Sequence, residues 1–429
     1  MLLTATLCLL AVGVVMVYSA SSASTVLQGG SGTSYLIKFS LYGVVGLLLM
    51  RFLAKDGVAR VQGLVGPLLG ISLLLVLAVH LPGIGVSVNG ARRWVGRGPI
   101  EFQPSELLKL SLVLYAATLL ASRPQRVHDL GELAKPLLLV VAGACLLLAT
   151  QPDIGTALVI VLTIAAMLLA AGIPIRNLAI IAGGVAGCVL VYALIRPYAM
   201  ARLTSFLNPW AHMYGSGFQE VQGQIAIGSG GLLGVGPGGS VQKAFYLGTE
   251  APTDFILAII GEELGVLGIC AVLSLYGMIC YAGLRIAGKA RSLHSALIAV
   301  GLTSLIVSQA ALNAFAVLGL APVTGVPLPF VSYGASNLIV MLAGVGLLLN
   351  IAAGGSTHVR PVLERPLRSS RSRRGARDRA GGDRRVPAGA SAGARIASAE
   401  PSGWMDEQSF DRHRRGRDGG PRRARARGR

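Results

Sequence analysis

The stretch DFILAIIGEELGVLGICAVLSLYGMICYAG, residues 254–283, begins with an acid and carries only two further charges, Glu262 and Glu263. A helix needs about 20 apolar residues to cross the hydrocarbon core of a bilayer. This stretch is therefore long enough to span a membrane. Runs of the same kind lie on both sides of it, and we expect ten spans, near residues 2–19, 35–53, 63–81, 105–121, 135–150, 154–171, 177–195, 254–283, 294–318 and 333–352.

The overall composition agrees with this pattern. Of the 429 residues, 53% are hydrophobic and 13% are charged, and the mean hydropathy is +0.65. Soluble domains carry about 25% charged residues. A soluble enzyme, a nucleic-acid-binding domain and a disordered regulator are therefore poor descriptions of the whole chain. We predict an all-α polytopic membrane protein with a long extracytoplasmic loop between the seventh and eighth helices.

The cysteines do not indicate a disulfide framework or a metal site, and the N-terminal run does not indicate a signal peptide. All five cysteines lie in apolar runs, so we interpret them as small apolar residues, not as disulfide or metal ligands. The N-terminal run has no positive segment before it and more spans follow. We therefore expect an uncleaved first helix, not a secretory signal peptide.

Lysine and arginine counts predict the orientation. With both termini in the cytoplasm, the short inner loops hold ten of these residues and the longer outer segments hold six. The residues 354–429 contain 20 Arg, no Lys and 8 acidic residues, a net +12 of the chain's +19. We predict a membrane domain over 1–352 and a disordered cytoplasmic tail over 353–429 that meets anionic lipid or a cytoplasmic protein partner, with no nucleic acid involved.

Two outer segments, 83–110 and 196–253, are too long to be simple connectors. The second contains Gly234-x-Gly236-x-x-Gly239, which formally matches a dinucleotide-binding fingerprint. However, no strand precedes it and Pro237 interrupts it. We interpret it as a re-entrant or interfacial turn.

Asp254 lies where the second outer segment meets an apolar helix. Thr253 or Asp254 could simply cap that helix, because an acid suits the positive end of the helix dipole. Alternatively, a carboxylate at the water–lipid boundary could accept a proton from a sugar hydroxyl. The residues alone leave both interpretations open.

Other charged residues also have two interpretations. Glu262 and Glu263 lie about two helical turns deeper, where acids are unfavourable, so they are either functional or paired with a cation such as Lys109. Arg92 and Arg93 precede Trp94, and the three either bind a pyrophosphate or anchor the segment at the interface.

Seven motifs occur in an order that resembles the SEDS family of bacterial FtsW, RodA and SpoVE: GARRW, QPSELLK, QPDIGTAL, FLNPW, GQIAIGSGGLLGVG, TDFILAIIGEELG and PVTGVPLPFVSYGAS. The resemblance covers nearly all of 1–352, and VVMVYSAS in the first span is more similar to FtsW than to RodA. Departures are small: Gly248 and Thr249 precede the acidic motif, and Ala335 and Asn337 replace the usual Gly and Ser.

The resemblance implies a glycosyltransferase that polymerises lipid II, and undecaprenyl-pyrophosphate-linked glycan, on the outer face of the cytoplasmic membrane. It also implies a class B penicillin-binding protein as partner, together with other division proteins at the septum. The family's essential acid corresponds to Asp254, the catalytic candidate. The candidate substrate-binding residues are Arg92, Arg93, Trp94, Gln103, Glu106, Lys109, Asp153, Lys243, Glu262 and Ser332. No cluster of ligands predicts a metal site, so a divalent cation (Mg²⁺ or Mn²⁺) would be held mainly by substrate and one carboxylate.

Three alternatives remain. A lipid II flippase or transporter would use Lys109, Glu262 and Glu263 as path residues. A division scaffold would need no catalysis, and an elongation-type polymerase similar to RodA would share the chemistry but not the septal location.

Overall fold

The computed structural model describes residues 1–355, except 28–31, 82, 89–90, 98–99 and 123–133. The predicted tail therefore lies outside the described residues, apart from its first three. The first half of the membrane domain consists of α1 (Leu2–Leu27), α2 (Ser34–Gln62), α3 (Val65–Ala78), β1 (Gly85–Val88), β2 (Ala91–Arg97), β3 (Ile100–Phe102), α4 (Pro104–Ser122), η2 (Ala134–Leu138), α6 (Leu139–Thr150) and α7 (Ile154–Ala170). The second half consists of α8 (Ile175–Ile195), α9 (Pro197–Leu207), η3 (Pro209–His212), α10 (Phe218–Gly230), α11 (Gln242–Phe245), η4 (Gly248–Glu250), α12 (Ile256–Gly288), α13 (Leu293–Val317) and α14 (Ala335–Ala352).

The helical membrane class is confirmed. Within the described part of the chain, seven helices are long and apolar enough to cross a membrane: α1, α2, α4, α8, α12, α13 and α14. Three shorter apolar helices, at Val65–Ala78, Pro136–Thr150 and Ile154–Ala170, fall where the other three spans were expected. The count of ten spans stays a prediction.

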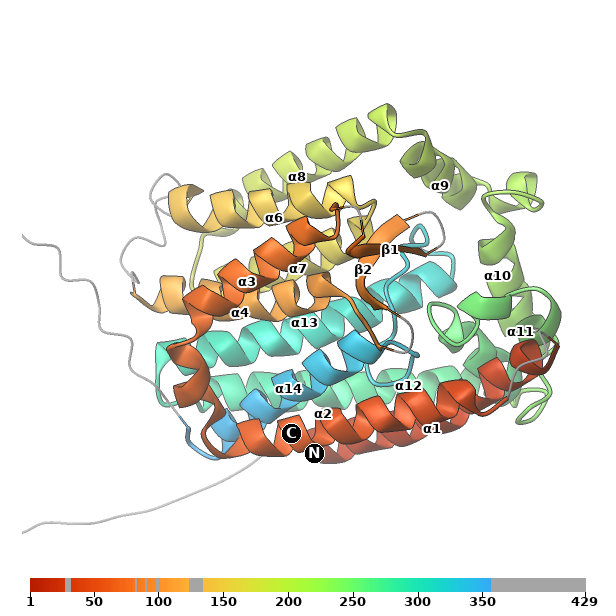
Figure 1. The fold of residues 1–429 in the computed structure, drawn as a ribbon, viewed down its shortest axis with the longest axis horizontal. Helices are drawn as coiled ribbons and strands as arrows, with labels where there is room; N and C mark the ends of the chain where they lie inside the picture. The colour runs from red at the N-terminus through yellow and green to blue at the C-terminus, as the bar shows by residue number, and fades with distance from the viewer. Residues whose placement is uncertain (28–31, 82, 89–90, 98–99, 123–133, 356–429) are drawn as a thin grey trace, which may run out of the picture. The chain divides into compact units, whose positions relative to one another are not determined.

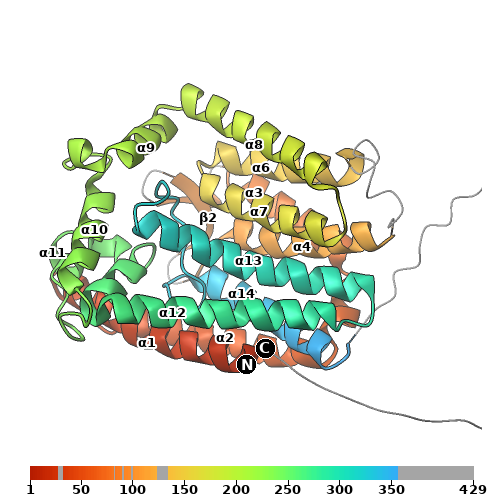
Figure 2. The same ribbon diagram turned by 180° about the vertical axis from the view of Figure 1, so that it is seen from behind.

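The bundle is organised around α13 and α14 (Figure 1). α13 packs against α4, α7 and α12, while α14 lies along α2, and α12 also contacts α1. Most of α14 is buried, whereas α8 is almost entirely exposed. From behind, α8 and α9 are seen along one edge of the bundle and lead into α10 at its end (Figure 2).

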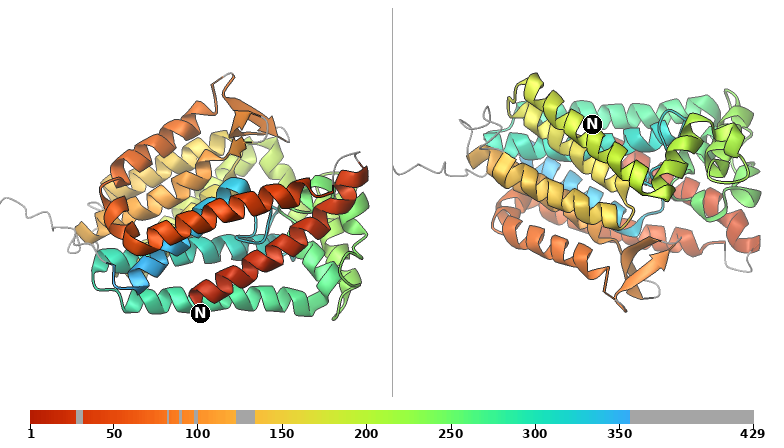
Figure 3. Two further views of the ribbon diagram at one scale, coloured as in Figure 1. Left: turned by 60° about the horizontal axis from the view of Figure 1, so that its bottom comes forward. Right: turned by 90° about the horizontal axis from the view of Figure 1, so that it is seen from above.

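A small antiparallel sheet interrupts the all-helical pattern between α3 and α4. Its order is β1-β2-β3, with Gly85 opposite Val95 and Val95 opposite Phe102. The sheet stands at the end of α3, at one end of the bundle (Figure 3). Because side chains alternate between the two faces of a strand, neighbouring residues of β2 point to opposite sides.

Helix α12 is broken at Gly265, which has φ +68° and ψ −168°. The segment 231–236 supplies the missing hydrogen bonds: Val235 N donates to Glu262 O at 2.9 Å, and Val266 N donates to Gly231 O at 2.9 Å. Backbone groups left unpaired in the bilayer are highly unfavourable, so this exchange stabilises the break.

The glycine motif in this segment is thus structural. A Cβ on Gly234 would lie 2.1 Å from Glu263 O, so a side chain there would collide with α12. The interpretation as a re-entrant turn, not a nucleotide site, agrees with this packing.

Candidate active site

Asp254 lies in the turn immediately before α12. The N-cap position of that helix is Phe255, and no side chain caps it. Thr253 Oγ1 instead donates to Glu250 O at 3.2 Å. The interpretation of Thr253 or Asp254 as a simple helix cap is therefore not what the structure shows.

The backbone around Asp254 is fixed by two distant segments. Asn313 of α13 donates from Nδ2 to Asp254 O at 2.8 Å and to Val326 O at 2.9 Å. Tyr333 N donates to Pro252 O at 2.8 Å. The turn is thus held against α13 and the proline-rich segment that leads into α14, which orients the carboxylate without using it.

The Asp254 carboxylate and the Arg93 guanidinium both approach Gly325. A Cβ on Gly325 would lie 3.5 Å from Asp254 Oδ2 and 3.9 Å from Arg93 Nη1. A small cavity here is also lined by Asn313 and Thr324. Asn313 Oδ1 and Thr324 Oγ1 are buried and have no hydrogen-bond partner among the described residues. The amide oxygen of Asn313 can accept a hydrogen bond from a bound ligand, and the hydroxyl of Thr324 can accept or donate one.

Burial raises the pKa of Asp254 to about 7. The nearby Glu250 carboxylate raises this pKa further, whereas Arg202 and Arg93 lower it and Asp153 raises it. A carboxyl with a pKa near neutrality exchanges protons readily at physiological pH, which suits a general base.

Of the neighbouring Arg92 and Arg93 in strand β2, only Arg93 reaches this site. Arg93 Nε donates to Gln151 O at 3.0 Å, and its Nη2 donates to Pro152 O. Arg92 is exposed, and Trp94 is partly buried opposite Val86 of β1. The structure therefore brings Arg93 close to Asp254. Arg92 and Trp94 make none of the contacts described around Asp254.

Asp153 and Gln103 have local contacts nearby. Asp153 caps α7, since its Oδ1 accepts from Thr156 N at 3.3 Å, and its Oδ2 accepts from Ser105 Oγ at 3.4 Å. Gln103 N donates to Ser336 Oγ at 2.9 Å. Asp153 thus acts on Asp254 through its charge, while Gln103 links β3 to the start of α14.

Glu106 and Lys109 form a buried ion pair on α4, with 2.9 Å between Oε2 and Nζ. Lys109 also donates to Gln309 Oε1 at 2.7 Å, and Asn337 Nδ2 donates to Glu106 Oε2 at 2.9 Å. Gln309 in turn donates to Pro327 O at 2.9 Å. This network connects α4 and α14 with the segment beside Asp254, and it is too enclosed for direct access.

A second buried cluster forms at the break in α12. Lys243 Nζ lies 2.6 Å from Glu263 Oε1, and Ser19 Oγ of α1 lies 2.7 Å from the same oxygen. Glu262 accepts hydrogen bonds from Ser240 Oγ and, at 3.0 Å, from Val241 N. The pairing considered between these acids and Lys109 is not formed.

Ser332 has a local role, because its Oγ accepts from Leu328 N at 2.8 Å. Several residues that were not predicted from the sequence hold the same segment. Arg202 Nη1 donates to Val323 O at 2.6 Å, and Glu220 Oε1 accepts from Val323 N at 3.4 Å. Both come from the long outer segment, where their charge was the only signal. Gln309 and Asn313 gave a clearer signal, because they are polar side chains four residues apart on an otherwise apolar helix and therefore share one of its faces.

No group of three His, Cys, Asp or Glu side chains suitable for a metal occurs in the part of the chain that the structure describes. Asp254 and Glu250 are the acids closest to the site that could share a cation with a ligand.

Comparison with known proteins gives a consistent picture. The FtsW/RodA/SpoVE family model, described as cell cycle protein, matches residues 1–356. The stage V sporulation protein E of Bacillus subtilis is 38% identical over 353 residues, covering 82% of this chain and 96% of that protein. A probable peptidoglycan glycosyltransferase FtsW of Coxiella burnetii is 40% identical over 352 residues, covering 81% of this chain and 94% of that protein. A chain in a solved peptidoglycan synthase complex is similar with a TM-score of 0.68 and 31% identity, covering 82% of this chain and 96% of that one.

Proposed function

This chain belongs to the FtsW/RodA/SpoVE family of cell cycle proteins, and from that premise we propose that it is a peptidoglycan glycosyltransferase that polymerises lipid II. The name of the Coxiella burnetii relative supports this activity. The observation that carries the proposal is Asp254 itself. Its carboxylate lies just before the first residue of α12 and does not cap that helix. The pKa of this carboxyl is raised to about 7, and the Arg93 guanidinium lies nearby, also beside Gly325.

In the proposed reaction, the 4-hydroxyl of one sugar attacks C1 of another. A new C1–O bond forms, the bond from C1 to the lipid pyrophosphate breaks, and the pyrophosphate leaves with the bonding electrons. The Asp254 carboxylate takes the hydroxyl proton. Asn313 Oδ1 and Thr324 Oγ1 line the adjacent cavity, whose volume of about 10 Å³ has room for no more than about one water molecule beside the carboxylate.

The pyrophosphate gains negative charge as it leaves, and cations placed beforehand stabilise that charge. Arg93 and Arg202 both act electrostatically on Asp254, so they lie close to the reacting atoms. Each is already oriented by a hydrogen bond to a backbone carbonyl. Because their positions are fixed, little reorganisation is needed during the reaction.

A divalent cation, Mg²⁺ or Mn²⁺, would fit this site only with help from the substrate. Asp254 and Glu250 could provide a carboxylate ligand, and the pyrophosphate oxygens would provide most of the others. Such a cation would neutralise charge on the leaving group. The chain's own residues would still position the sugar and take the proton.

The proposed location is the bacterial cytoplasmic membrane, with both termini in the cytoplasm and Asp254 on the outer face. The excess of lysine and arginine in the short inner loops supports this orientation. The similar chain in a peptidoglycan synthase complex supports a class B penicillin-binding protein as partner, since that complex couples polymerisation to crosslinking. Identity to the FtsW relative favours a role at the division septum.

Transport is the second candidate, and the buried charges argue against it. Glu106, Lys109, Lys243 and Glu263 are paired in two fixed clusters within the bundle. A transport path would need charged groups accessible to a moving substrate.

The pH dependence of polymerisation should follow Asp254. Its pKa is raised from 3.8 to about 7, and only the ionised form accepts a proton, so kcat/KM should rise up to about pH 7 and then level off. Because Glu250 raises this pKa and Arg202 lowers it, Glu250→Gln should move the rise to lower pH and Arg202→Gln to higher pH. Initial rates measured from about pH 5 to about pH 9, roughly two units either side of the expected pKa, test both shifts. Shifts of both variants in one direction would contradict it.

Reconstitution tests the function. The full chain is placed in proteoliposomes with a penicillin-binding protein whose crosslinking serine is disabled, and fluorescent lipid II is supplied. Glycan polymer is the expected product. Lipid II that changes leaflet without forming polymer would instead support the transporter, and neither product would favour a scaffold.

A further inference from the structure

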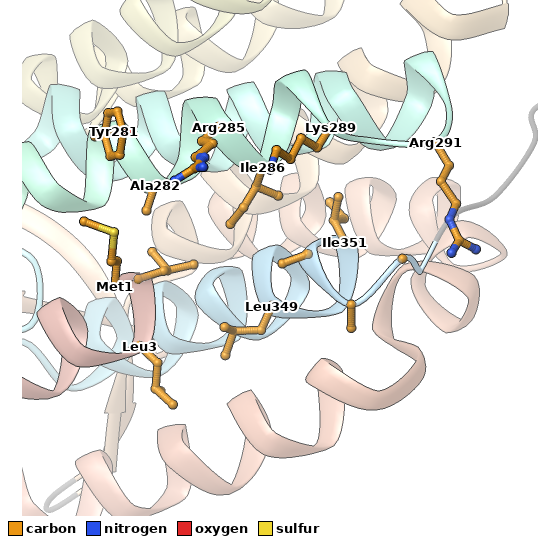
Figure 4. A pocket seen from close by; sticks show the side chains of 14 residues that line it. Met1, Leu3, Tyr281, Ala282, Arg285, Ile286, Lys289, Arg291, Leu349 and Ile351 are labelled. Atoms are coloured by element: carbon orange, nitrogen blue, oxygen red, sulfur yellow. The ribbon is translucent and has the colours of Figure 1, made fainter.

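A cavity of about 540 Å³ lies at the end of the bundle opposite Asp254. It is formed by the first turn of α1, the last turns of α12 and the end of α14 (Figure 4). Its volume falls within the range of about 300–1,000 Å³ that is typical of small-molecule sites. The walls are largely apolar, with Leu2, Ala282, Ile286 and Leu349 among the lining residues.

Three cations line this cavity: Arg285, Lys289 and Arg291. Arg285 lies in the last turn of α12, and Lys289 is the C-cap residue of the same helix. None of the three forms an ion pair with an acid among the described residues, and no acidic residue lines the cavity. Arg291 lies across Gly354, where a Cβ would be 2.9 Å from its Nη2. The site therefore concentrates positive charge over an apolar hollow.

Exposed apolar side chains border the cavity. Tyr281 and Leu3 border the cavity and are 55% and 40% exposed. A ligand with a charged head and apolar chains matches this arrangement, whereas a small soluble anion would leave the apolar surface unused.

We propose that this cavity binds the headgroup of an acidic phospholipid, with its phosphate beside Arg285, Lys289 and Arg291 and its acyl chains along α1 and α12. Charge complementarity selects this occupant. The chain's own residues 356–429 carry a net +12 and would be repelled by the three cations. The bound lipid would join the ends of α1, α12 and α14, so it should stabilise the bundle. In the proposed orientation, it belongs to the inner leaflet.

Native mass spectrometry of the full chain tests the proposal with phosphatidylglycerol and phosphatidylcholine of identical acyl chains. Wild type should retain one phosphatidylglycerol with a preference of about tenfold or more, because each cation near a membrane surface favours anionic lipid. Arg285→Gln/Lys289→Gln should lose most of that preference. Arg51→Gln/Lys55→Gln is the matched control, since it removes two exposed cations with the same spacing from α2, away from the cavity.

A second variant separates the cavity from surface charge. Ala353→Trp keeps all three cations and fills the cavity from an exposed position on its rim, so it should also lose the lipid. Three outcomes would overturn the proposal: equal losses in both charge variants, a phosphatidylglycerol preference that survives Ala353→Trp, or displacement of the lipid by glycerol phosphate, which would indicate a soluble anion. A wild-type chain without phosphatidylglycerol preference would overturn it directly.

Discussion

Asp254→Asn is expected to lower the rate of lipid II polymerisation by about 10²–10⁴-fold, the usual contribution of a general base. Asn preserves the size of the side chain and its packing beside Gly325, but it cannot accept the proton. The rate is measured with purified full chain and the silenced penicillin-binding protein. Asp56→Asn is the matched control, because Asp56 is exposed and pairs only with Arg60 among the described residues.

The stability of Asp254→Asn should not follow its activity. Folding raises the pKa of Asp254 from 3.8 to about 7, so ionisation of this group destabilises the fold as the pH rises through that window. Asn removes the charge. At about pH 8, roughly one unit above that pKa, the melting temperature of the variant should therefore equal or exceed that of wild type. A variant that loses activity together with stability would point to a structural role for Asp254.

Lys243→Met is expected to lower the free energy of unfolding by about 3–5 kcal/mol, because it leaves Glu263 buried without its cation. The two side chains are only 4% and 1% exposed and lie 2.6 Å apart. Denaturant unfolding of the purified chain in detergent measures the change. The pair ties α11 to α12, so the turn that carries Asp254 should also lose its fixed position.

The double variant Lys243→Met/Glu263→Gln should recover much of that loss, since no buried charge remains. Arg60→Met provides the matched control. It breaks the Arg60–Asp56 pair, whose side chains are 43% and 68% exposed, and should cost less than about 1 kcal/mol. Equal losses in Lys243→Met and in the double variant would show that the ion pair is not the stabilising interaction.

The helical membrane class could be predicted because apolar run length is itself the physical signal. The long connection before α12 and the position of Asp254 at the helix start followed from the same pattern. The small sheet could not be found in this way, because its strands are short and β2 carries three arginines among seven residues. The break at Gly265 was also missed. A Cβ on Gly265 would lie 2.4 Å from Leu232 O, so the break depends on a close approach by the segment 231–236, for which the sequence of α12 alone gives no signal.

The candidate site shows the same limit. The sequence motifs singled out Asp254 and Arg93, which both approach Gly325, yet they also grouped Arg92 and Trp94 with these two residues. Arg92 and Arg93 point to opposite faces of β2, because successive side chains alternate along a strand. This rule could not be applied before the strand itself was known. The partners of Lys109 and Lys243 come from helices distant in sequence, so a single chain gives no signal for their pairing.

The most direct test of the account is the initial rate of polymerisation from purified lipid II by wild type, Asp254→Asn and Asp56→Asn, each with the silenced partner. Glycan polymer is expected from wild type and from Asp56→Asn, and almost none from an equally folded Asp254→Asn. Polymer from Asp254→Asn at the wild-type rate would contradict the assignment of Asp254 as the base.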